Sequence, residues 1–224
     1  MGKKYEFTGE TKDWFGLTLM RIRALVKIEK FCVEPGDEGG WIEDGVNLSQ
    51  EGDAWVSGNA KVYGNAKVSD DAWVSGNAEV CGDAKVCDDA WVSGNAKVYG
   101  NAFVYGNAKV YGNAKVSGDA KVSGDAKVCG DAKVCGDAKV KRIEHLMIVG
   151  PIGSRNDITT FFRTKGGVIK VNCGCFHGTI SEFLAKVEAT HGDSKHGKVY
   201  RLAAELAMAQ IETDWEEDEN EVHS

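Results

Sequence analysis

Residues 91–116 read WVSGNAKVYGNAFVYGNAKVYGNAKV, and close copies of this six-residue unit run from Glu51 to Lys141. A unit has a valine, then Ser, Tyr or Cys, usually a glycine, then Asn or Asp, an alanine and a variable residue. Fifteen valines recur at strict intervals of six from Val56 to Val140. A period of six fits neither the 3.6-residue turn of an α-helix nor the two-residue alternation of a flat strand. The repeat therefore predicts a coiled solenoid.

The repeat also predicts how many units close one coil. Trp55, Trp73 and Trp91 recur every eighteen residues, and DDAWVSGNA occurs at both 70–78 and 88–96. Three units therefore form a coil, with each valine and the alanine four positions later pointing inward. The Gly-Asn and Gly-Asp pairs form the corners, because these residues adopt positive φ easily. Fifteen units give about five coils, stacked at the ~4.8 Å spacing of hydrogen-bonded strands.

The units VYGNAK, VSGNAE and VCGDAK resemble the hexapeptide repeat of left-handed parallel β-helices, in which an aliphatic residue is followed four positions later by a small one. The resemblance covers residues 51–141 and implies left-handed winding. The best-known members of that superfamily are trimeric acyltransferases, so the resemblance also suggests a homo-oligomer, with a trimer favoured.

The flanking segments resemble a second group. The opening KKYEFTGETKDWFGLTLMRIRAL, the GDEGGWIE entry and the closing TTFFRTKGG, NCGCFHGTISEF and THGDSK are similar to segments of phage and prophage proteins of bacteria that carry the same repeat. This resemblance implies a viral or mobile-element context and no particular activity.

We therefore expect a mainly β protein: a left-handed parallel β-helix of about five coils, with an N-terminal β cap and a C-terminal α+β domain. In the cap, GDEGGWIEDG is expected to be a turn-rich entry, with Trp41 and Ile42 as plugs of the first coil. The predicted divisions are a cap at 1–50, the β-helix at 51–141, the α+β domain at 142–213 and an acidic tail at 214–224.

Three strands and two helices are predicted in the C-terminal domain. IEHLMIVGPIG, residues 143–153, is expected to be a strand, and TTFFRT and VIKVNC form a hairpin around Lys165-Gly166-Gly167. Thr179 and Glu182 form a capping box that opens a helix to about Thr190. HGDSKHG is expected to break the chain before a second helix, from about Lys198 to Ile211, whose apolar residues include Leu202, Leu206 and Met208.

Charge and cysteine content limit the class of partner. Residues 212–221 carry seven carboxylates and no Lys or Arg, which accounts for the whole formal charge of −7. The rest of the chain has no net basic field, so direct nucleic-acid binding is not expected. The acidic tail is interpreted as a solubilising extension or as a docking segment for a basic partner. Seven cysteines without an N-terminal apolar segment indicate a reducing compartment, the cytoplasm, and the resemblance to phage proteins implies that it is the cytoplasm of a bacterial host cell. No apolar run is long enough to span a membrane, so no membrane partner is expected.

The tryptophan column is the first candidate functional surface. Trp55, Trp73 and Trp91 should form a continuous apolar strip at the N-terminal end of the solenoid, with Asp71 and Asp89 beside it. One interpretation is a stacked ladder that only stabilises the coils. The other is an interface with a second subunit or a partner, because exposed aromatic strips with a polar rim often mark one.

The C-terminal domain offers further candidate sites. Cys173, Cys175 and His177 could begin a zinc site, although the C-x-C-x-H spacing is tighter than usual and no bound metal or other cofactor is predicted. Cys175 and His191 could form a nucleophile–base pair.

A third hypothesis for this domain is an anion site at the start of the first helix. Gly178 and Thr179 would offer free backbone N–H groups there, with Arg163, Lys165 and Lys170 adding positive charge. The plain alternative is that these cysteines and glycines are structural.

These sequence features favour one functional hypothesis over two others. Residues 51–141 contain no histidine and no inserted loop, and His145 just beyond them is expected to be a strand residue, which disfavours a hexapeptide-type acyltransferase. The leading hypothesis is a non-enzymatic phage or prophage accessory protein. It would be an oligomer that inhibits a host factor, for example a defence factor, by docking on it or by sequestering a small anionic ligand. The alternative is a structural protein of the virion or its assembly.

Overall fold

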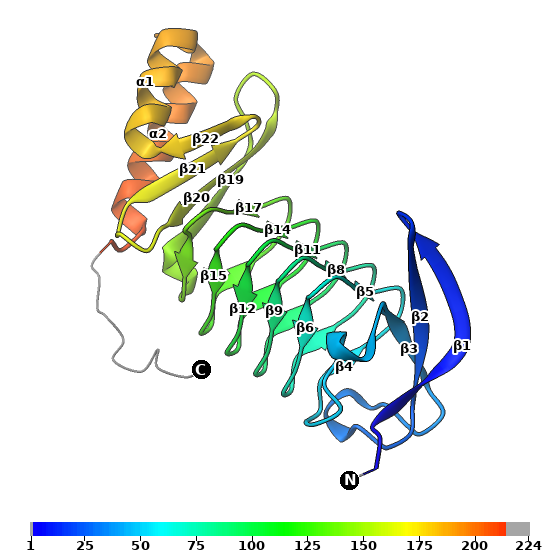
Figure 1. Cartoon of the computed structure of the whole chain (residues 1–224). Coiled ribbons are helices and arrows are strands. Elements are labelled where there is room, and N and C mark those ends of the chain that lie inside the picture. The colour runs from blue at the N-terminus through cyan, green and yellow to red at the C-terminus, as the bar shows by residue number, and fades with distance from the viewer. Residues whose placement is uncertain (1, 214–224) are drawn as a thin grey trace. The chain divides into compact units, whose positions relative to one another are not determined.

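The computed structural model describes residues 2–213 and divides into two compact units, Met1–Ile143 and Glu144 onward (Figure 1). The predicted acidic tail at 214–224 lies outside the described residues. Within them, no helix is long and apolar enough to span a membrane.

The first unit contains fifteen two-residue strands that stack into three parallel sheets, one for each side of the coil (Figure 1). The first sheet has β5 (Lys61–Val62), β8 (Glu79–Val80), β11 (Lys97–Val98), β14 (Lys115–Val116) and β17 (Lys133–Val134). The second has β4 (Trp55–Val56), β7 (Trp73–Val74), β10 (Trp91–Val92), β13 (Lys109–Val110) and β16 (Lys127–Val128). The third has β6 (Lys67–Val68), β9 (Lys85–Val86), β12 (Phe103–Val104), β15 (Lys121–Val122) and β18 (Lys139–Val140).

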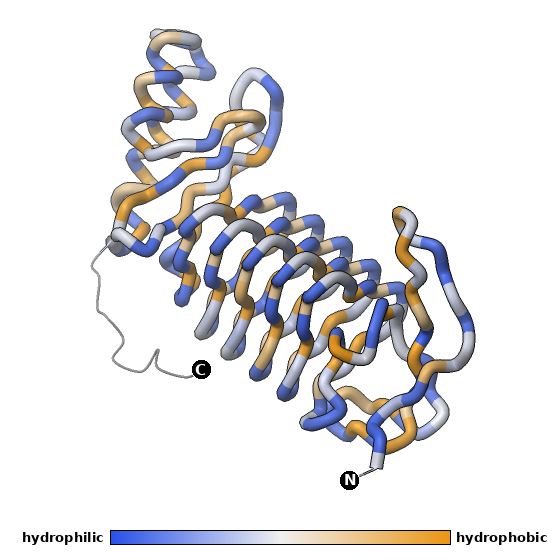
Figure 2. The backbone as a smooth tube through the Cα atoms, viewed as in Figure 1, coloured by the Kyte–Doolittle hydropathy of each residue, from blue (hydrophilic) through white to orange (hydrophobic). Residues whose placement is uncertain are grey.

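The register confirms a coil of three units. Each strand pairs with the strand eighteen residues away, as in Val98↔Val116, and Lys97 N–H donates to the carbonyl of Ala114 at 2.9 Å. The repeat valines and alanines are at most 1% exposed, so they form the predicted core. Figure 2 shows hydrophobic and hydrophilic residues alternating around the coils.

Side chains at the corners form ladders that the sequence reasoning did not identify. The Asn77 amide donates to Asn95 Oδ1 at 3.1 Å, Asn95 to Asn113 at 3.0 Å, and Asn113 to Asp131 at 2.9 Å. An amide both donates and accepts, whereas an ionised carboxylate only accepts, so the aspartate stands at the end of this ladder. These bonds join neighbouring coils on the solvent side of the backbone.

The N-terminal segment contributes one coil more than expected. β1 (Tyr5–Trp14) and β2 (Leu17–Ala24) are antiparallel, and β3 (Glu38–Ile42) pairs antiparallel with β2 but parallel with β5. Short 3₁₀ turns at Glu29–Phe31 and Gly45–Asn47 lie on either side of β3, and Leu48 makes a parallel bridge to Val68. The solenoid therefore has about six turns, not five, and the GGWI stretch is a strand, not a turn-rich entry. Trp41 and Ile42 are buried in this added turn.

The second unit is an antiparallel sheet that packs against two helices. Its strands, in spatial order, are β19 (Leu146–Ile152), β20 (Asp157–Arg163), β21 (Ile169–Cys173) and β22 (Phe176–Thr179). α1 (Ile180–His191) and α2 (Lys195–Gln210) follow. The predicted hairpin and capping box are confirmed, and the predicted strand is confirmed from Leu146 onward. Ile143–His145 forms a 3₁₀ turn, so His145 is not the strand residue that was expected. Phe161 and Val171 of the sheet pack with Phe183 of α1 and Ala204 of α2.

The second helix begins earlier than predicted, and the apolar residues named from its sequence lie outside the core. It begins at Lys195, because the Ser194 hydroxyl accepts a hydrogen bond from Gly197 N–H at 3.2 Å and caps the helix earlier than expected. Its core face is Tyr200, Ala203, Ala204 and Ala207, while Leu202 and Leu206 are 63% and 56% exposed. The small alanines let the helix lie close to the sheet, which leaves the larger leucines on the outer side.

Candidate functional site

The tryptophan column lies on the second sheet of the solenoid, and its three rings differ in exposure. Trp55 is 1% exposed, because Gly39 of β3 lies against it, Trp73 is half-buried and Trp91 is 40% exposed. Trp73 and Trp91 are stacked at 5.6 Å with planes 7° apart, and Trp73 Nε1 donates to Ser57 Oγ at 2.9 Å. The predicted strip of three exposed indoles is therefore shorter, and Trp55 belongs to the interior.

The 3₁₀ turn at Glu29–Phe31 packs over Trp73 in this column. The Phe31 ring lies 4.4 Å from the Trp73 ring, and Lys30 Nζ forms ion pairs with Asp71, at 3.3 Å, and with Asp89. Burial alone would lower the pKa of Lys30, but its bonds to the two carboxylates outweigh burial and raise that pKa. Asp71 and Asp89 thus bind the 3₁₀ turn of the N-terminal segment to the solenoid through Lys30.

A groove of about 570 Å³ continues along the same sheet. Its walls include Trp91, Lys109, Lys127 and Ile143, and Lys109 Nζ lies 5.3 Å from the Trp91 ring centre. We call the column Trp73, Trp91, Lys109 and Lys127 the Trp91 face. It joins an exposed aromatic ring, two exposed lysines and the Asp71–Asp89 rim on one side of the solenoid.

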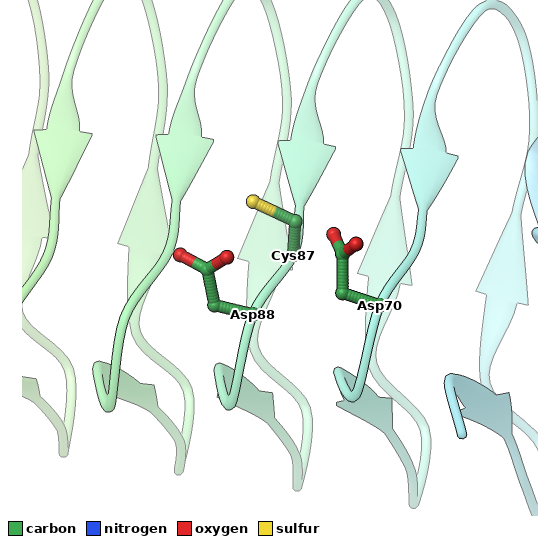
Figure 3. A group of neighbouring side chains, drawn as sticks. All are labelled: Asp70, Cys87 and Asp88. Carbon is green, nitrogen blue, oxygen red and sulfur yellow. The ribbon is translucent and has the colours of Figure 1, made fainter. Parts of the chain in front are cut away.

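A second cluster lies at a corner where aspartates replace two of the repeat glycines. Asp70 and Asp88 have φ of 57° and 55°, the left-handed conformation of the corner glycines. Figure 3 shows their carboxylates and the Cys87 thiol projecting from two neighbouring coils, with the potential ligand atoms within 4.8 Å of one another. Asp70 Oδ2 accepts from Ser69 Oγ at 2.7 Å, and Asp88 Oδ2 accepts from Gly106 N–H at 2.9 Å.

The Cys87 thiol of this cluster is held in its protonated form. Burial, followed by the charges of Asp88 and Asp70, raises the pKa of the Cys87 thiol to about 12. The thiolate is the form that binds metal. Burial and, to a lesser extent, these carboxylates hold the metal-free thiol protonated, and we assign the cluster no function.

The cysteine–histidine candidates of the second unit do not come together. Asn172 and His177 are opposite each other in the β21–β22 hairpin, with His177 Nδ1 2.7 Å from Asn172 Oδ1. Cys173 pairs with Phe176 and packs against the helix core, so it lies on the other face of the sheet. Among residues 2–213, the only group of three close ligand side chains is the one at Cys87, so the Cys173, Cys175 and His177 set is not assembled.

The predicted anion site at the start of α1 is filled by the chain itself. Glu182 Oε2 accepts from Thr179 N–H at 2.7 Å and from Thr179 Oγ1 at 3.0 Å. These bonds, the backbone one first, lower the pKa of Glu182. A Cβ at Gly178 would lie 2.7 Å from the same carboxylate, so no room is left there for another anion.

The three basic residues proposed for that site are also separated. Arg163 is 6% exposed with its guanidinium 3.2 Å from His145 Nε2, whereas Lys165 is exposed in the β20–β21 turn. Arg163 pairs with Ile169, the neighbour of Lys170, so Arg163 and Lys170 point to opposite faces of the sheet. His145, the histidine nearest the repeat, is 1% exposed, which does not suit a catalytic base for a bound substrate.

A cleft that the sequence did not indicate lies in the same unit. It has a volume of about 230 Å³ and is lined by Arg155, Cys173, Cys175, Lys186, His191 and Tyr200 among others. Cys175 and His191 therefore share a cleft, as a nucleophile pair would require. Within the described chain no hydrogen bond orients the His191 ring, which packs against Tyr200 at 5.6 Å, so the third member of a catalytic set is missing.

Arg155, Lys186 and Tyr200 come from three separate elements, and no local motif joins them. Arg155 lies in the β19–β20 turn, Lys186 on α1 and Tyr200 on α2. Only the tertiary fold brings them together, which is why the sequence reasoning missed this cleft.

Comparison of the chain with protein-family models and with curated proteins finds no match.

Proposed function

We propose that the protein is a non-enzymatic binding module that self-associates through the Trp91 face and recognises its partner with the C-terminal unit. The observation that carries the proposal is the exposed Trp91 ring at the edge of an open groove of about 570 Å³. A large aromatic ring that is exposed among charged residues is typical of an interface core with a polar rim.

Charge complementarity favours a second copy of this chain as the occupant of the groove. The third sheet of the solenoid presents Lys67 and Lys85, both exposed, and the half-buried Phe103. Phe103 can pack on the Trp91 ring, and Lys67 and Lys85 can reach the carboxylate oxygens of Asp71 and Asp89 that the ion pairs with Lys30 leave open. Contacts between two different faces are heterologous, and they close into a ring when the rotation between neighbouring subunits allows it. We propose a trimer because the resemblance to hexapeptide proteins implies one, and the same resemblance implies that each solenoid winds left-handed.

Molecular mass under native conditions tests this proposal. The wild-type chain should be a trimer at micromolar concentration, and Trp91→Ala should shift it to monomer. Tyr99→Ala is the matched control, because Tyr99 is 39% exposed against 40% for Trp91 but follows β11 on another sheet. A monomeric wild type, or equal effects of the two variants, would remove the Trp91 face from the proposal.

The complementary surface has its own test. Lys67→Glu with Lys85→Glu should dissociate the trimer as Trp91→Ala does. Lys115→Glu with Lys133→Glu should not, because these two exposed lysines lie on the first sheet. Dissociation by both pairs would indicate a general charge effect and contradict the assigned pairing of faces.

The biological setting in this proposal comes from the sequence resemblance. The protein would be a phage or prophage accessory protein in the cytoplasm of the bacterial host, where it inhibits a host factor by docking or by sequestering a small anion. Its seven cysteines are all free thiols, in keeping with a reducing compartment. A position among early phage genes would agree with this role, whereas a position among tail or capsid genes would favour a structural part of the virion.

A further inference from the structure

The cleft of the C-terminal unit has a floor of aromatic and aliphatic side chains. Phe176 of β22 and Phe183 of α1 have ring centres 5.5 Å apart, and Val187 lies one turn further along α1. Both strand and helix are fixed by the core of this unit, which includes Phe183 and Val187 at 3% exposure each. The floor is therefore rigid and preformed, as is usual for small-molecule sites.

Tyr200 supplies a hydroxyl in the wall of the cleft. Its ring is held edge-on against Phe183 at 5.6 Å, and a Cβ at Gly153 would lie 1.7 Å from its oxygen, so only glycine fits there. Burial, followed by the neighbouring Cys173 thiol, raises the pKa of Tyr200 to about 12. The phenol is therefore protonated at neutral pH and can donate a hydrogen bond.

Positive charge lines the opening. Arg155 extends over the β21–β22 turn, where its Nη1 lies 3.4 Å from the position of a Cβ at Gly174, and Lys186 is exposed on α1. Within residues 2–213 neither cation has a hydrogen bond or an ion pair. The one carboxylate in the lining, Asp157, accepts a bond from Ile158 N–H at 2.7 Å.

We propose that this cleft binds a small organic anion, whose phosphate or carboxylate group contacts Arg155 and Lys186 and whose flat apolar part rests on Phe176 and Phe183. The volume of about 230 Å³ is smaller than the ~300 Å³ at which typical ligand pockets begin, so the ligand has about one ring and one anionic group. The inference rests on the sequestration arm of the proposed function and moves it from the start of α1 to this cleft.

Calorimetric titration of the full chain with phenyl phosphate tests the proposal. Benzyl alcohol shares the ring but lacks the charge, and inorganic phosphate shares the charge but lacks the ring. Phenyl phosphate should bind at least about tenfold more tightly than either, because charge-assisted bonds and apolar burial both contribute. Equal affinity for benzyl alcohol would overturn the anionic assignment, and equal affinity for inorganic phosphate would overturn the apolar floor.

Three variants place the site. Arg155→Gln and Lys186→Gln should each weaken phenyl phosphate binding about tenfold. Lys165→Gln, which removes an exposed lysine from the β20–β21 turn of the same unit, should leave it unchanged. Weakening by Lys165→Gln to the same degree would show general charge attraction and overturn the site. Because Arg155 and Lys186 are exposed and outside the core, folding of these variants is not in doubt, and circular dichroism serves as the check.

The oligomeric state of the same samples separates this inference from the proposed function. A wild-type trimer that does not bind phenyl phosphate would refute anion binding in the cleft but would still support self-association through the Trp91 face. A monomeric wild type that binds phenyl phosphate, with loss in Arg155→Gln, would support the cleft and refute the self-association.

Discussion

At the residue scale, the sequence predicts the burial of a residue well wherever the neighbours of that residue are part of the same repeat. Inward valines meet similar neighbours from coil to coil, so the period alone identified the core of the repeat. The tryptophans show the limit of this reasoning. Trp55 and Trp91 occupy equivalent repeat positions but are 1% and 40% exposed, because Gly39, which lies against Trp55, is outside the repeat. Periodicity carries no information about such a cover.

Gly39 offers a direct test of that cover. A Cβ at this position would lie 2.5 Å from Ile22 Cγ1, 2.7 Å from the Val56 carbonyl oxygen and 2.8 Å from the Trp55 ring. Gly39→Ala should therefore reduce the free energy of unfolding by about 2 kcal/mol, the usual cost of overpacking. Chemical denaturation measures the change.

The control for this variant is Gly45→Ala. A Cβ at Gly45 would have no neighbour within 4 Å, so the expected change in stability is within about 0.5 kcal/mol. A similar loss in both variants would mean that β3 does not pack closely on the first coil.

At the element scale, local signals located most boundaries, and the errors have specific causes. The capping box at Thr179 placed the first helix correctly, because a box fixes a helix start by two reciprocal bonds. The same box leaves no anion site at the start of α1, because the Glu182 carboxylate accepts from the Thr179 N–H group that the anion would need. Ser194 caps α2 without a box, and this weaker signal predicts only a break in the chain at HGDSKHG. GGWI lacks the alternation of an exposed strand because β3 is buried along most of its length.

The capping box predicts a pH dependence. The pKa of Glu182 is lowered in the folded state, so its contribution to stability is complete above the ordinary value of 4.5 and is lost as the pH falls through the lower folded value. Glu182→Ala should therefore lower the melting temperature at pH 7. The difference from wild type should shrink as the pH is brought down to about 2, below any ordinary carboxyl pKa.

Glu205→Ala is the control for this measurement, because Glu205 is an exposed glutamate on α2 away from either end of the helix. Its melting temperature should follow that of the wild type at both pH values. A Glu182→Ala difference that stays constant between pH 7 and pH 2 would show that the carboxylate does not cap α1 in solution.

At the scale of the whole molecule, the sequence predicted two kinds of architecture and their order along the chain, but it could not predict the cleft of the C-terminal unit. The solenoid is read from a repeat because each coil contacts only its neighbours. The cleft depends on Arg155, Lys186 and Tyr200, which lie as much as 45 residues apart and meet only after folding. A binding site of this kind leaves no periodic or local pattern to recognise.

The solenoid makes a last prediction about the whole chain. Deletion of residues 97–114 removes one coil and joins Ala96 to Lys115, so that Val116 takes the place of Val98 and every column stays in register. This variant should fold and unfold cooperatively, with a lower denaturation midpoint because one interface between coils is lost.

Deletion of residues 97–105 is the control for this variant. It removes only half as many residues, yet Val110 then falls where Asn101 stood, and the later valines point to solvent. The shorter deletion should therefore abolish the cooperative transition and the β-sheet circular dichroism of the solenoid. If it folds as well as the longer deletion, the eighteen-residue coil does not govern stability, and the inward valine columns are not what holds the solenoid together.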